Sequence, residues 1–332
     1  MRSLQKPPAL RPGDTLGVIA PSGPVKPELL AQGVQELQRI GYRVVLGDGI
    51  LSSQGYFAGG HRQRAEAFLD LLANPDINGI FCARGGYGSN YVVEYLAAPA
   101  VLRRLRTLPP RIVMGYSDVT SLLLFFSQRL GWVTFQGPML TKDFAEGEAA
   151  YDRCVLERVL SDPASGFILR SNALSLRAGV AEGKLVGGCL SLLTATLGTP
   201  EEIDTRGAIL LLEDIDEKPY RIDRMLFQLR RAGKFQGVAA FVFGEMIGCR
   251  PASSPVGGLH DVILDAIGKM KVPIVFGFPF GHTNGGNLTI PLGVRARLSA
   301  GREVTLRLLE PSVNRHAPSI KKFSKPGRSA GS

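Results

Sequence analysis

The residues best placed to do chemistry begin with a serine. The apolar run RIVMG ends shortly before Ser117, and an amphipathic helix is predicted from Val119 to Leu130. A turn from strand to helix is typical of a nucleophile elbow, which exposes the serine hydroxyl above the sheet. The backbone N–H of Asp118, at the helix N-terminus, would face a developing oxyanion. The usual second glycine is replaced by Val119, and a simple helix cap at Ser117 or Asp118 is the alternative interpretation.

A nucleophilic serine needs a base, and the chain has four histidines. His282 follows an apolar strand and immediately precedes a glycine-rich turn, a loop position of the kind that holds catalytic side chains. His316 falls in a basic terminal segment, His61 begins a charged helix, and His260 lies in a polar stretch before a helix. His282 is therefore the predicted base, with a loop histidine that binds backbone groups as the alternative.

A third residue should orient that base. Glu213 ends the buried run AILLL, so its carboxylate emerges at a strand terminus and is the predicted orienting acid. Asp216 and Glu217 better fit solvation and capping of the next helix, with Arg221 as an ion-pair partner. The chain order serine, acid, histidine is one of several that build the same geometry.

A glycine-rich turn, RGGYG, begins at Arg84. Such a turn can present backbone N–H groups to an anion. Its spacing is neither GxGxxG nor GxxxxGK[ST], so neither a dinucleotide nor a P-loop is predicted, and no cofactor is expected. Gly85 or Gly86 would supply a second oxyanion donor. Arg84 would pair with a substrate carboxylate, or alternatively with a structural acid.

Strands and helices alternate around these residues. In the first half, strands predicted at 15–20, 42–46, 77–82 and 111–115 alternate with helices at 27–41, 62–73, 89–96 and 119–130. This alternation predicts an α/β fold with a parallel, helix-covered sheet. In the second half, strands are predicted at 208–212, 238–243, 272–276, 289–298 and 303–309, with a helix at 220–231.

The periodicity lapses between Lys142 and Lys184, which indicates a crossover between two domains. We therefore predict an α/β nucleophile domain at 1–145, a crossover at 146–183 and a β-rich domain at 184–312 that carries Glu213 and His282. Residues 313–332 are predicted to be a basic, disordered tail, because their composition cannot offset the entropy of ordering.

The net charge of the 332 residues is +10, from 39 Lys and Arg against 29 Asp and Glu. Five of these charges fall in the segment 314–332 and two in 1–14, which leaves +3 for the rest of the chain. A body this close to neutrality gives no support for a nucleic-acid groove. Charge therefore excludes nucleic acid as the predicted partner.

No apolar run approaches the ~18–20 residues of a membrane span, and no signal-peptide core precedes the first strand. We therefore predict a soluble, cytoplasmic protein without a membrane partner. The four cysteines, none in a CxxC pair, are predicted to be reduced. No histidines stand at HxxxH spacing, so no metal site is predicted.

Together these motifs resemble the LD-carboxypeptidase family, also called muramoyltetrapeptide carboxypeptidases. These are serine peptidases that include the microcin C self-immunity proteins. The resemblance covers residues 9–298 and is carried by LRPGDTLGVIAPSGPV, FAGGHRQRAEAFLDLL, ARGGYGSN, MGYSDVTSLLLFF, FQGPML, LLEDIDEKPYRIDRMLFQL and FGFPFGHTNGGNLTIPLG.

The resemblance implies a catalytic triad of Ser117, Glu213 and His282, with an oxyanion hole from the backbone N–H groups of Asp118 and Gly86. It further implies a parallel sheet of Rossmann or flavodoxin-like type, a smaller β-rich C-terminal domain, and a homodimer. The implied reaction removes the terminal D-alanine from murein tetrapeptides in peptidoglycan recycling. Cys189 departs from the asparagine usual in the family, which leaves details of substrate contact open.

Two alternatives remain at this point. An immunity-type member of the family would cleave an aminoacyl-nucleotide analogue instead of a murein peptide, and the sequence does not distinguish the two pockets. A non-catalytic binding protein on the same scaffold is the other alternative. The intact set of Ser117, Glu213 and His282 argues against it.

Overall fold

The computed structural model describes residues 4–249 and 258–315. Its first sheet has the strand order β12-β5-β4-β3-β1-β2, in which every pair is parallel except β12–β5. The strands are β1 (Thr15–Ile19), β2 (Arg43–Leu46), β3 (Gly79–Cys82), β4 (Ile112–Gly115), β5 (Thr134–Gln136) and β12 (Ile290–Leu292). The order 2-1-3-4-5 of the parallel strands is that of flavodoxin-like sheets, so the fold class predicted for the first half is confirmed.

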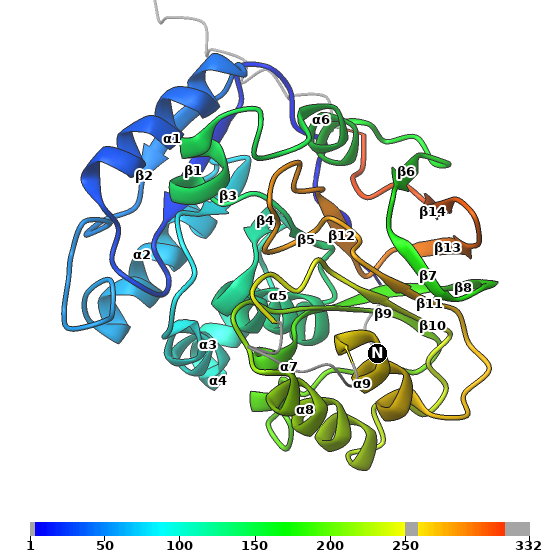
Figure 1. Cartoon of the computed structure of the whole chain (residues 1–332). Coiled ribbons are helices and arrows are strands. Elements are labelled where there is room, and N and C mark those ends of the chain that lie inside the picture. The colour runs from blue at the N-terminus through cyan, green and yellow to red at the C-terminus, as the bar shows by residue number, and fades with distance from the viewer. Residues whose placement is uncertain (1–3, 250–257, 316–332) are drawn as a thin grey trace, which may run out of the picture.

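Helices pack on both faces of this sheet (Figure 1). On one face α1 (Pro27–Arg39) packs against the short π-helix η3 (Leu140–Phe144). On the other, α2 (His61–Ala73) packs against α3 (Ser89–Ala97), and α3 packs against α5 (Thr120–Phe125). The remaining helical segments of this half are α4 (Pro99–Leu105), η1 (Ser117–Val119) and η2 (Phe126–Leu130).

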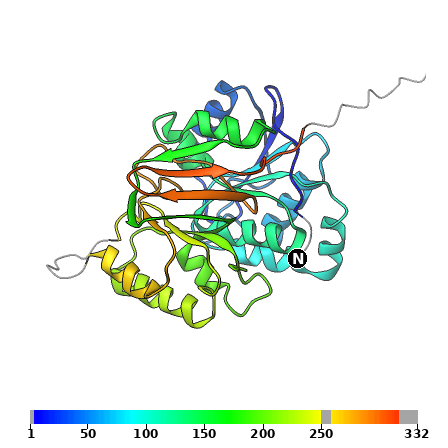
Figure 2. The same ribbon diagram turned by 90° about the vertical axis from the view of Figure 1, so that its right-hand side faces the viewer.

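The second sheet has the order β6-β14-β13-β8-β9-β10-β11-β7, and its four strands from β8 to β11 are parallel. Its strands are β6 (Ile168–Ser171), β7 (Leu174–Arg177), β8 (Gly179–Cys189), β9 (Ala208–Glu213), β10 (Ala240–Phe243), β11 (Ile274–Phe276), β13 (Arg295–Ala300) and β14 (Val304–Leu308). Its helical neighbours are α6 (Arg153–Ser161), α7 (Leu190–Ala195), α8 (Pro219–Arg231) and α9 (Leu259–Ile267). Figure 2 shows α8 and α9 together on one side of this sheet.

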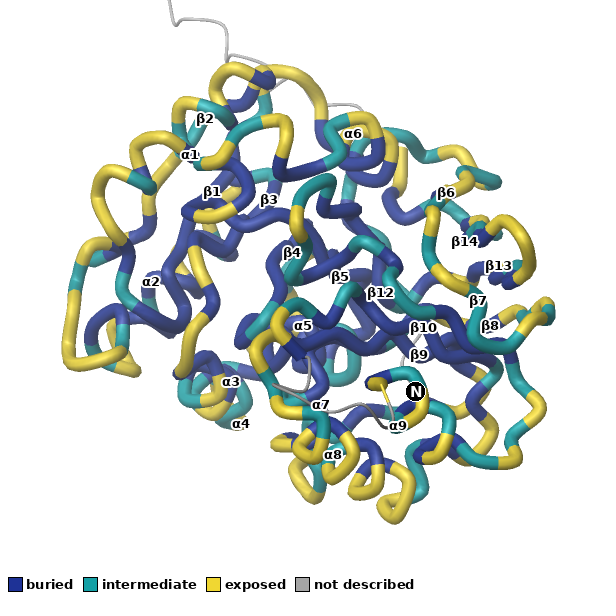
Figure 3. Tube along the Cα trace, in the orientation of Figure 1, coloured by how far each residue is buried: buried dark blue, intermediate teal, exposed yellow. Residues whose placement is uncertain are grey.

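The core of the second sheet is split between its two faces. Along β9, Leu210 and Leu212 pack in the cluster that contains residues of α8 and α9, whereas Ile209 and Leu211 belong to the large cluster that includes the first sheet. A strand that is buried on both faces reads as a continuous apolar run, which is why AILLL is so clear in the sequence. Figure 3 shows the central strands of both sheets buried, with more exposed helices and edge strands around them.

The chain crosses between the two sheets more than once. The segment 146–183, predicted as a crossover, contains α6 and supplies β6, β7 and the first residues of β8. Later, β12 returns to the first sheet by pairing with β5. The two sheets therefore share one hydrophobic core cluster.

The predicted tail at 313–332 starts too early. Val313 is fully buried, and Asn314 exchanges backbone hydrogen bonds with the segment at Pro7 and Ala9. These contacts order the start of the segment despite its polar composition, while residues 316–332 lie outside the described residues. In the described part of the chain, no helix is long and apolar enough to cross a bilayer.

Candidate active site

Ser117 lies on a strained turn between β4 and α5. Its φ is +60°, in the left-handed region that residues with a side chain rarely enter. The turn leads into η1 and the buried α5, so surrounding packing holds this conformation. Ser117 thus occupies the type of strand-to-helix turn that the sequence predicts for a nucleophile elbow.

The glycine-rich turn after β3 lies directly against this serine. A Cβ atom on Gly85 would come within 2.8 Å of Ser117 Cβ and 2.9 Å of Ser117 Oγ, so only glycine fits there. Gly86, with φ of +106°, lies beside Gly23 of the turn that follows β1. Within the described residues, no hydrogen bond takes up the backbone N–H of Gly86 or of Asp118. Both N–H groups that are predicted to bind the oxyanion therefore lack an acceptor among the described residues.

The side chain of Asp118 connects three loops at the carboxyl ends of the strands. Its Oδ2 accepts hydrogen bonds from Ser22 Oγ (2.6 Å) and from the Ser89 N–H (2.7 Å). Ser22 follows β1, Ser89 begins α3, and Asp118 follows β4. Hydrogen bonds to a buried carboxylate are among the stronger ones in proteins. The sequence predicts a backbone oxyanion donor or a helix cap at Asp118, and this link between three loops was not predicted.

Arg64 is a second positioning residue that the sequence analysis missed. This arginine of α2 is only 2% exposed, and its guanidinium donates to the carbonyls of Pro21, Gly59 (3.3 Å) and Gly88 (2.9 Å). It therefore links the loop after β1 to the loop after β3. Arg64 stands four residues before the apolar Phe68, so both lie on the same face of the helix. This spacing could have indicated that Arg64 is buried.

Glu213 reaches the site because of the alternation along β9. It follows Ile209 and Leu211 on the face that belongs to the shared core, and it is fully buried. A Cβ on Gly281 would come within 2.5 Å of the carboxyl carbon of Glu213, so the loop before His282 can approach only because glycine is there.

His282, which is 15% exposed, forms a hydrogen-bonded pair with the fully buried Glu213. Nδ1 of His282 lies 2.7 Å from Oε2 of Glu213, and the backbone N–H of His282 donates to the same oxygen at 3.1 Å. An Nδ1–H held by the carboxylate leaves the lone pair on Nε2 for a proton.

The charges around His282 shift its pKa. Burial opposes the charged imidazolium and is the largest single influence on this pKa. The charge and hydrogen bond of Glu213, with the charges of Asp214 and Asp143, together outweigh burial and raise the pKa of His282 above the ordinary 6.5. A raised pKa makes His282 a stronger base than an isolated imidazole.

The buried Asn287 joins the loop that carries His282 to Asp143 of η3, which packs beside the first sheet. Asn287 Nδ2 donates to Gly281 O (3.0 Å) and to Asp143 Oδ1 (3.3 Å), and Gly281 N donates to Asn287 Oδ1 (3.2 Å). The sequence analysis treated the NGGN motif, which ends at Asn287, only as a turn signal. It is also a bridge that holds the predicted base in place.

The nucleophile turn and the histidine loop meet at Tyr116. The buried Tyr116 ring stands edge-on to the His282 imidazole, with ring centroids 5.0 Å apart, and Ser117 is the next residue. Among the described residues, Ser117 and His282 share no hydrogen bond. Such bonds often tighten only when substrate binds. The three predicted residues are therefore gathered at one place, with the serine and histidine not yet in contact.

The other predicted residues lie as follows. Arg84 is exposed, donates to Pro24 O (2.8 Å) and has no ion-pair partner among the described residues. Glu217 forms an ion pair with Arg221 (3.2 Å), which agrees with the structural role near the helix start that the sequence favours for it. Cys189, opposite Glu213 on β8, is buried, and burial followed by the charge of Glu213 raises its pKa well above the ordinary value.

The remaining histidines are elsewhere. His61 stacks on Tyr91, with centroids 4.1 Å apart. His260 lies inside α9 against Phe276, which corrects its predicted place before that helix. His316 lies outside the described residues. In the described ranges, no group of three or more His, Cys, Asp or Glu is arranged to hold a metal ion.

A serine on a strained strand-to-helix turn, with a hydrogen-bonded histidine–carboxylate pair beside it, is the arrangement found in serine hydrolases. Models of known protein families match both halves of the chain. The LD-carboxypeptidase N-terminal domain matches residues 16–137, and the LD-carboxypeptidase C-terminal domain matches residues 182–298. The chain belongs to the LD-carboxypeptidase family and is a serine carboxypeptidase.

Individual relatives agree with this assignment. A probable murein peptide carboxypeptidase of Bacillus subtilis is 35% identical over 91% of this chain and 93% of its own length. The structure of a muramoyltetrapeptide carboxypeptidase from Oxalobacter formigenes matches with a TM-score of 0.78 at 28% identity, covering 90% of this chain and 99% of that one.

The microcin C7 self-immunity protein MccF of Escherichia coli is also similar, at 28% identity over 85% of this chain and 90% of its own length. Its structure with aspartyl sulfamoyl adenosine matches with a TM-score of 0.84, covering 93% of this chain and 99% of that one. The similarity thus extends to two kinds of named protein within the family.

Proposed function

We propose that this enzyme removes the terminal D-alanine from murein tetrapeptides, acting in peptidoglycan recycling. The observation that carries the proposal is the hydrogen-bonded pair of His282 and Glu213 beside the strained turn of Ser117. The named murein peptide relatives supply the substrate class.

In the proposed reaction, Nε2 of His282 takes the proton of Ser117 Oγ as that oxygen attacks the carbonyl carbon of the amide. Glu213 holds Nδ1–H and stabilises the imidazolium. The N–H groups of Asp118 and Gly86 bind the oxyanion of the tetrahedral intermediate. When the C–N bond breaks, the imidazolium gives its proton to the departing amine of D-alanine, which leaves an acyl-enzyme.

Water completes the cycle. His282 takes a proton from the water that attacks the acyl carbon, and then returns it to Ser117 Oγ as the ester bond breaks. The shortened peptide leaves with a new carboxylate. Arg84, exposed and without an ion-pair partner among the described residues, would bind the terminal carboxylate of D-alanine beside Gly85.

The direct test is release of D-alanine from a purified murein tetrapeptide. Ser117→Ala should abolish release while the circular dichroism spectrum and melting temperature stay those of the parent. A matched control is Ser165→Ala, an exposed serine, which should keep full activity. Retained release by Ser117→Ala would rule out the serine mechanism.

A second candidate function is cleavage of aminoacyl-nucleotide analogues, which the similarity to the MccF complex favours. The exposed rings of Tyr56 and Tyr87, 5.8 Å apart, offer faces on which a base could stack. Assaying the murein peptide and an aspartyl sulfamoyl adenosine side by side separates the two functions. A larger kcat/KM for the nucleotide analogue would favour the second.

The remaining parts of the proposal concern assembly and location. The cytoplasmic location and the homodimer follow from the sequence and the family resemblance, and sedimentation of the purified chain tests the dimer. A binding protein without activity would fail to react with serine-directed acylating probes, whereas the proposed enzyme reacts at Ser117.

A further inference from the structure

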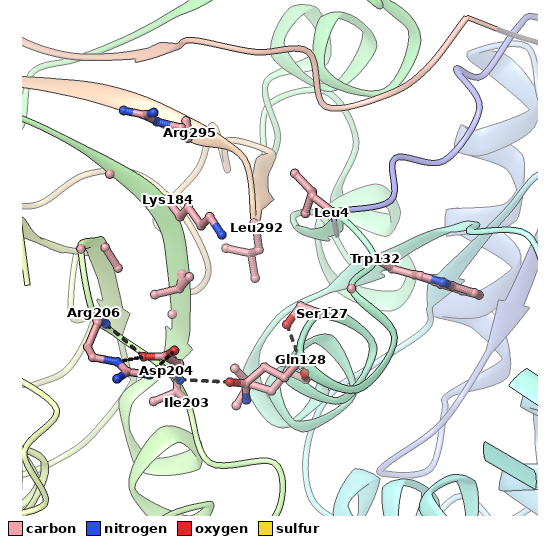
Figure 4. A pocket seen from close by; sticks show the side chains of 18 of the residues that line it. Leu4, Ser127, Gln128, Trp132, Lys184, Ile203, Asp204, Arg206, Leu292 and Arg295 are labelled. Carbon is pink, nitrogen blue, oxygen red and sulfur yellow. Dashed lines mark hydrogen bonds and ion pairs between the residues drawn. The ribbon is translucent and has the colours of Figure 1, made fainter. Parts of the chain in front are cut away.

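A cavity lies between the two sheets, away from the candidate active site. Its volume is about 390 Å³, within the range of small-molecule sites, and its lining includes none of Ser117, Glu213 and His282. Leu124 and Leu292 come from the side of the first sheet, and Lys184 and Val186 come from β8 of the second (Figure 4). We call it the inter-sheet cavity.

The floor of the inter-sheet cavity is apolar. Leu4, Leu124, Val186, Ile203 and Leu292 line it, and Figure 4 shows the side chain of Lys184 extending toward Leu292. A hydrocarbon group could bury apolar surface against these side chains. The floor therefore fits the body of an amphipathic ligand.

The rim of this cavity carries unbalanced positive charge. Lys184 and Arg295 stand directly opposite each other on β8 and β13. Glu182 is the neighbouring acid, and it is already shared by Arg295 (3.4 Å) and Arg297. The charged residues that line the cavity are Lys184, Arg206 and Arg295 against Glu182 and Asp204, which leaves a net charge of +1.

Lys184 is the cavity-lining cation that lacks an ion-pair partner among the described residues. The other acid of the rim, Asp204, is paired with Arg206 at 3.1 Å. A bound anion would give Lys184 an ion-pair partner. The charge pattern therefore selects an anionic head group.

We propose that the inter-sheet cavity binds an amphipathic monoanion, a carboxylate with a hydrocarbon body, with its head group on Lys184. This site is independent of the proposed function, since it shares no residue with the candidate active site. Octanoate is a suitable probe because it carries one carboxylate and a flexible apolar chain.

The experiment is calorimetric titration of octanoate into the full chain at low salt, before and after covalent blocking of Ser117 by a serine-directed acylating probe. We expect one saturable site per chain. Lys184→Met should weaken binding about fivefold, the change expected when one partly exposed ion pair is lost. The matched control Lys269→Met, at an exposed lysine of the loop after α9, should bind as the parent does.

A second titration uses octanol, which has the same apolar chain as octanoate but no charge. Octanol should bind more weakly than octanoate to the parent and equally to parent and Lys184→Met. Absence of saturable octanoate binding, equal affinity of Lys184→Met and parent, or loss of the site when Ser117 is blocked would each overturn the proposal. The last outcome would mean that octanoate had bound in the active site.

Discussion

The nucleophile loops and the acid–base pair are held in place by different means. Around Ser117, position depends on sterics and on a network, since Gly85 leaves no room for a Cβ and Asp118 joins loops from three strands. Around His282, position depends on the buried carboxylate of Glu213 and on the Asn287 bridge, and Glu213 is the main group that raises the pKa of His282. The second oxygen of Glu213, Oε1, has no hydrogen-bond partner among the described residues.

This difference suggests that the two regions fail differently. A change near Ser117 should alter geometry and leave the pH profile alone, because no titrating group is added or removed. A change at Glu213 should alter the pH profile as well as the rate, because it removes a charge that acts on His282. The following experiments test this distinction.

The largest effect is expected for Glu213→Gln. In comparable triads, replacing the acid by its amide lowers kcat by about 10⁴-fold. The base must be neutral to act, so activity falls as the pH drops through the pKa of His282. Glu213 raises that pKa, so its removal should also move the acidic limb of kcat/KM to lower pH.

The matched control is Glu217→Gln, which removes an acid four residues away that pairs with Arg221. It should change neither the rate nor the pH profile appreciably. If Glu213→Gln kept full turnover and Glu217→Gln did not, the acid would be Glu217.

The next largest effect is expected for Gly85→Ala. The added methyl would displace Ser117 or the turn that faces it, because it would lie only 2.8 Å from Ser117 Cβ. Misplacing a reacting group by about 1 Å costs on the order of 10²-fold in rate. The acidic limb should stay where it is, and Gly301→Ala, in an open hairpin, should have no effect. A shifted pH profile in Gly85→Ala would contradict the distinction.

A smaller effect is expected for Ser22→Ala. Losing the hydrogen bond to the buried carboxylate of Asp118 should lower the free energy of unfolding by about 1–3 kcal/mol. Denaturant titration measures this loss, with Ser165→Ala as the exposed control. Stability equal to that of the parent would show that the three-loop network does not depend on Ser22.

The smallest effect is expected on deleting residues 316–332. The contacts described for this end of the chain are made by earlier residues such as Val313 and Asn314, which the deletion keeps. Turnover of the murein tetrapeptide should therefore remain within about twofold of the full chain, since no active-site residue is touched. A large loss of activity would give the basic segment a role that the described structure does not contain.

The sequence could predict β1 to β4 and the helices α1, α2, α3 and α5 of the first half because each is short and clearly periodic, but it did not predict α4 or β5. It could also place Ser117, Glu213 and His282, which all follow recognisable apolar strands. It did not predict β8, because Gly179–Cys189 is rich in glycine and partly exposed, and its pairing with β9 and β13 comes from distant residues.

The supporting residues of the site were also beyond the sequence. The contacts of Asp118 with Ser22 and of Asn287 with Asp143 join segments about a hundred residues apart or more. Local spacing carries no signal for such pairs. They arise only when the carboxyl ends of several strands meet at one edge.

The most direct test of the account is covalent labelling by a fluorophosphonate, followed by mass spectrometry of the digested chain. We expect one label per chain, on the peptide that contains Ser117, with labelling greatly slowed in His282→Ala and absent in Ser117→Ala. Labelling of a different serine, or unchanged labelling of Ser117→Ala, would contradict the claim that Ser117 is the nucleophile.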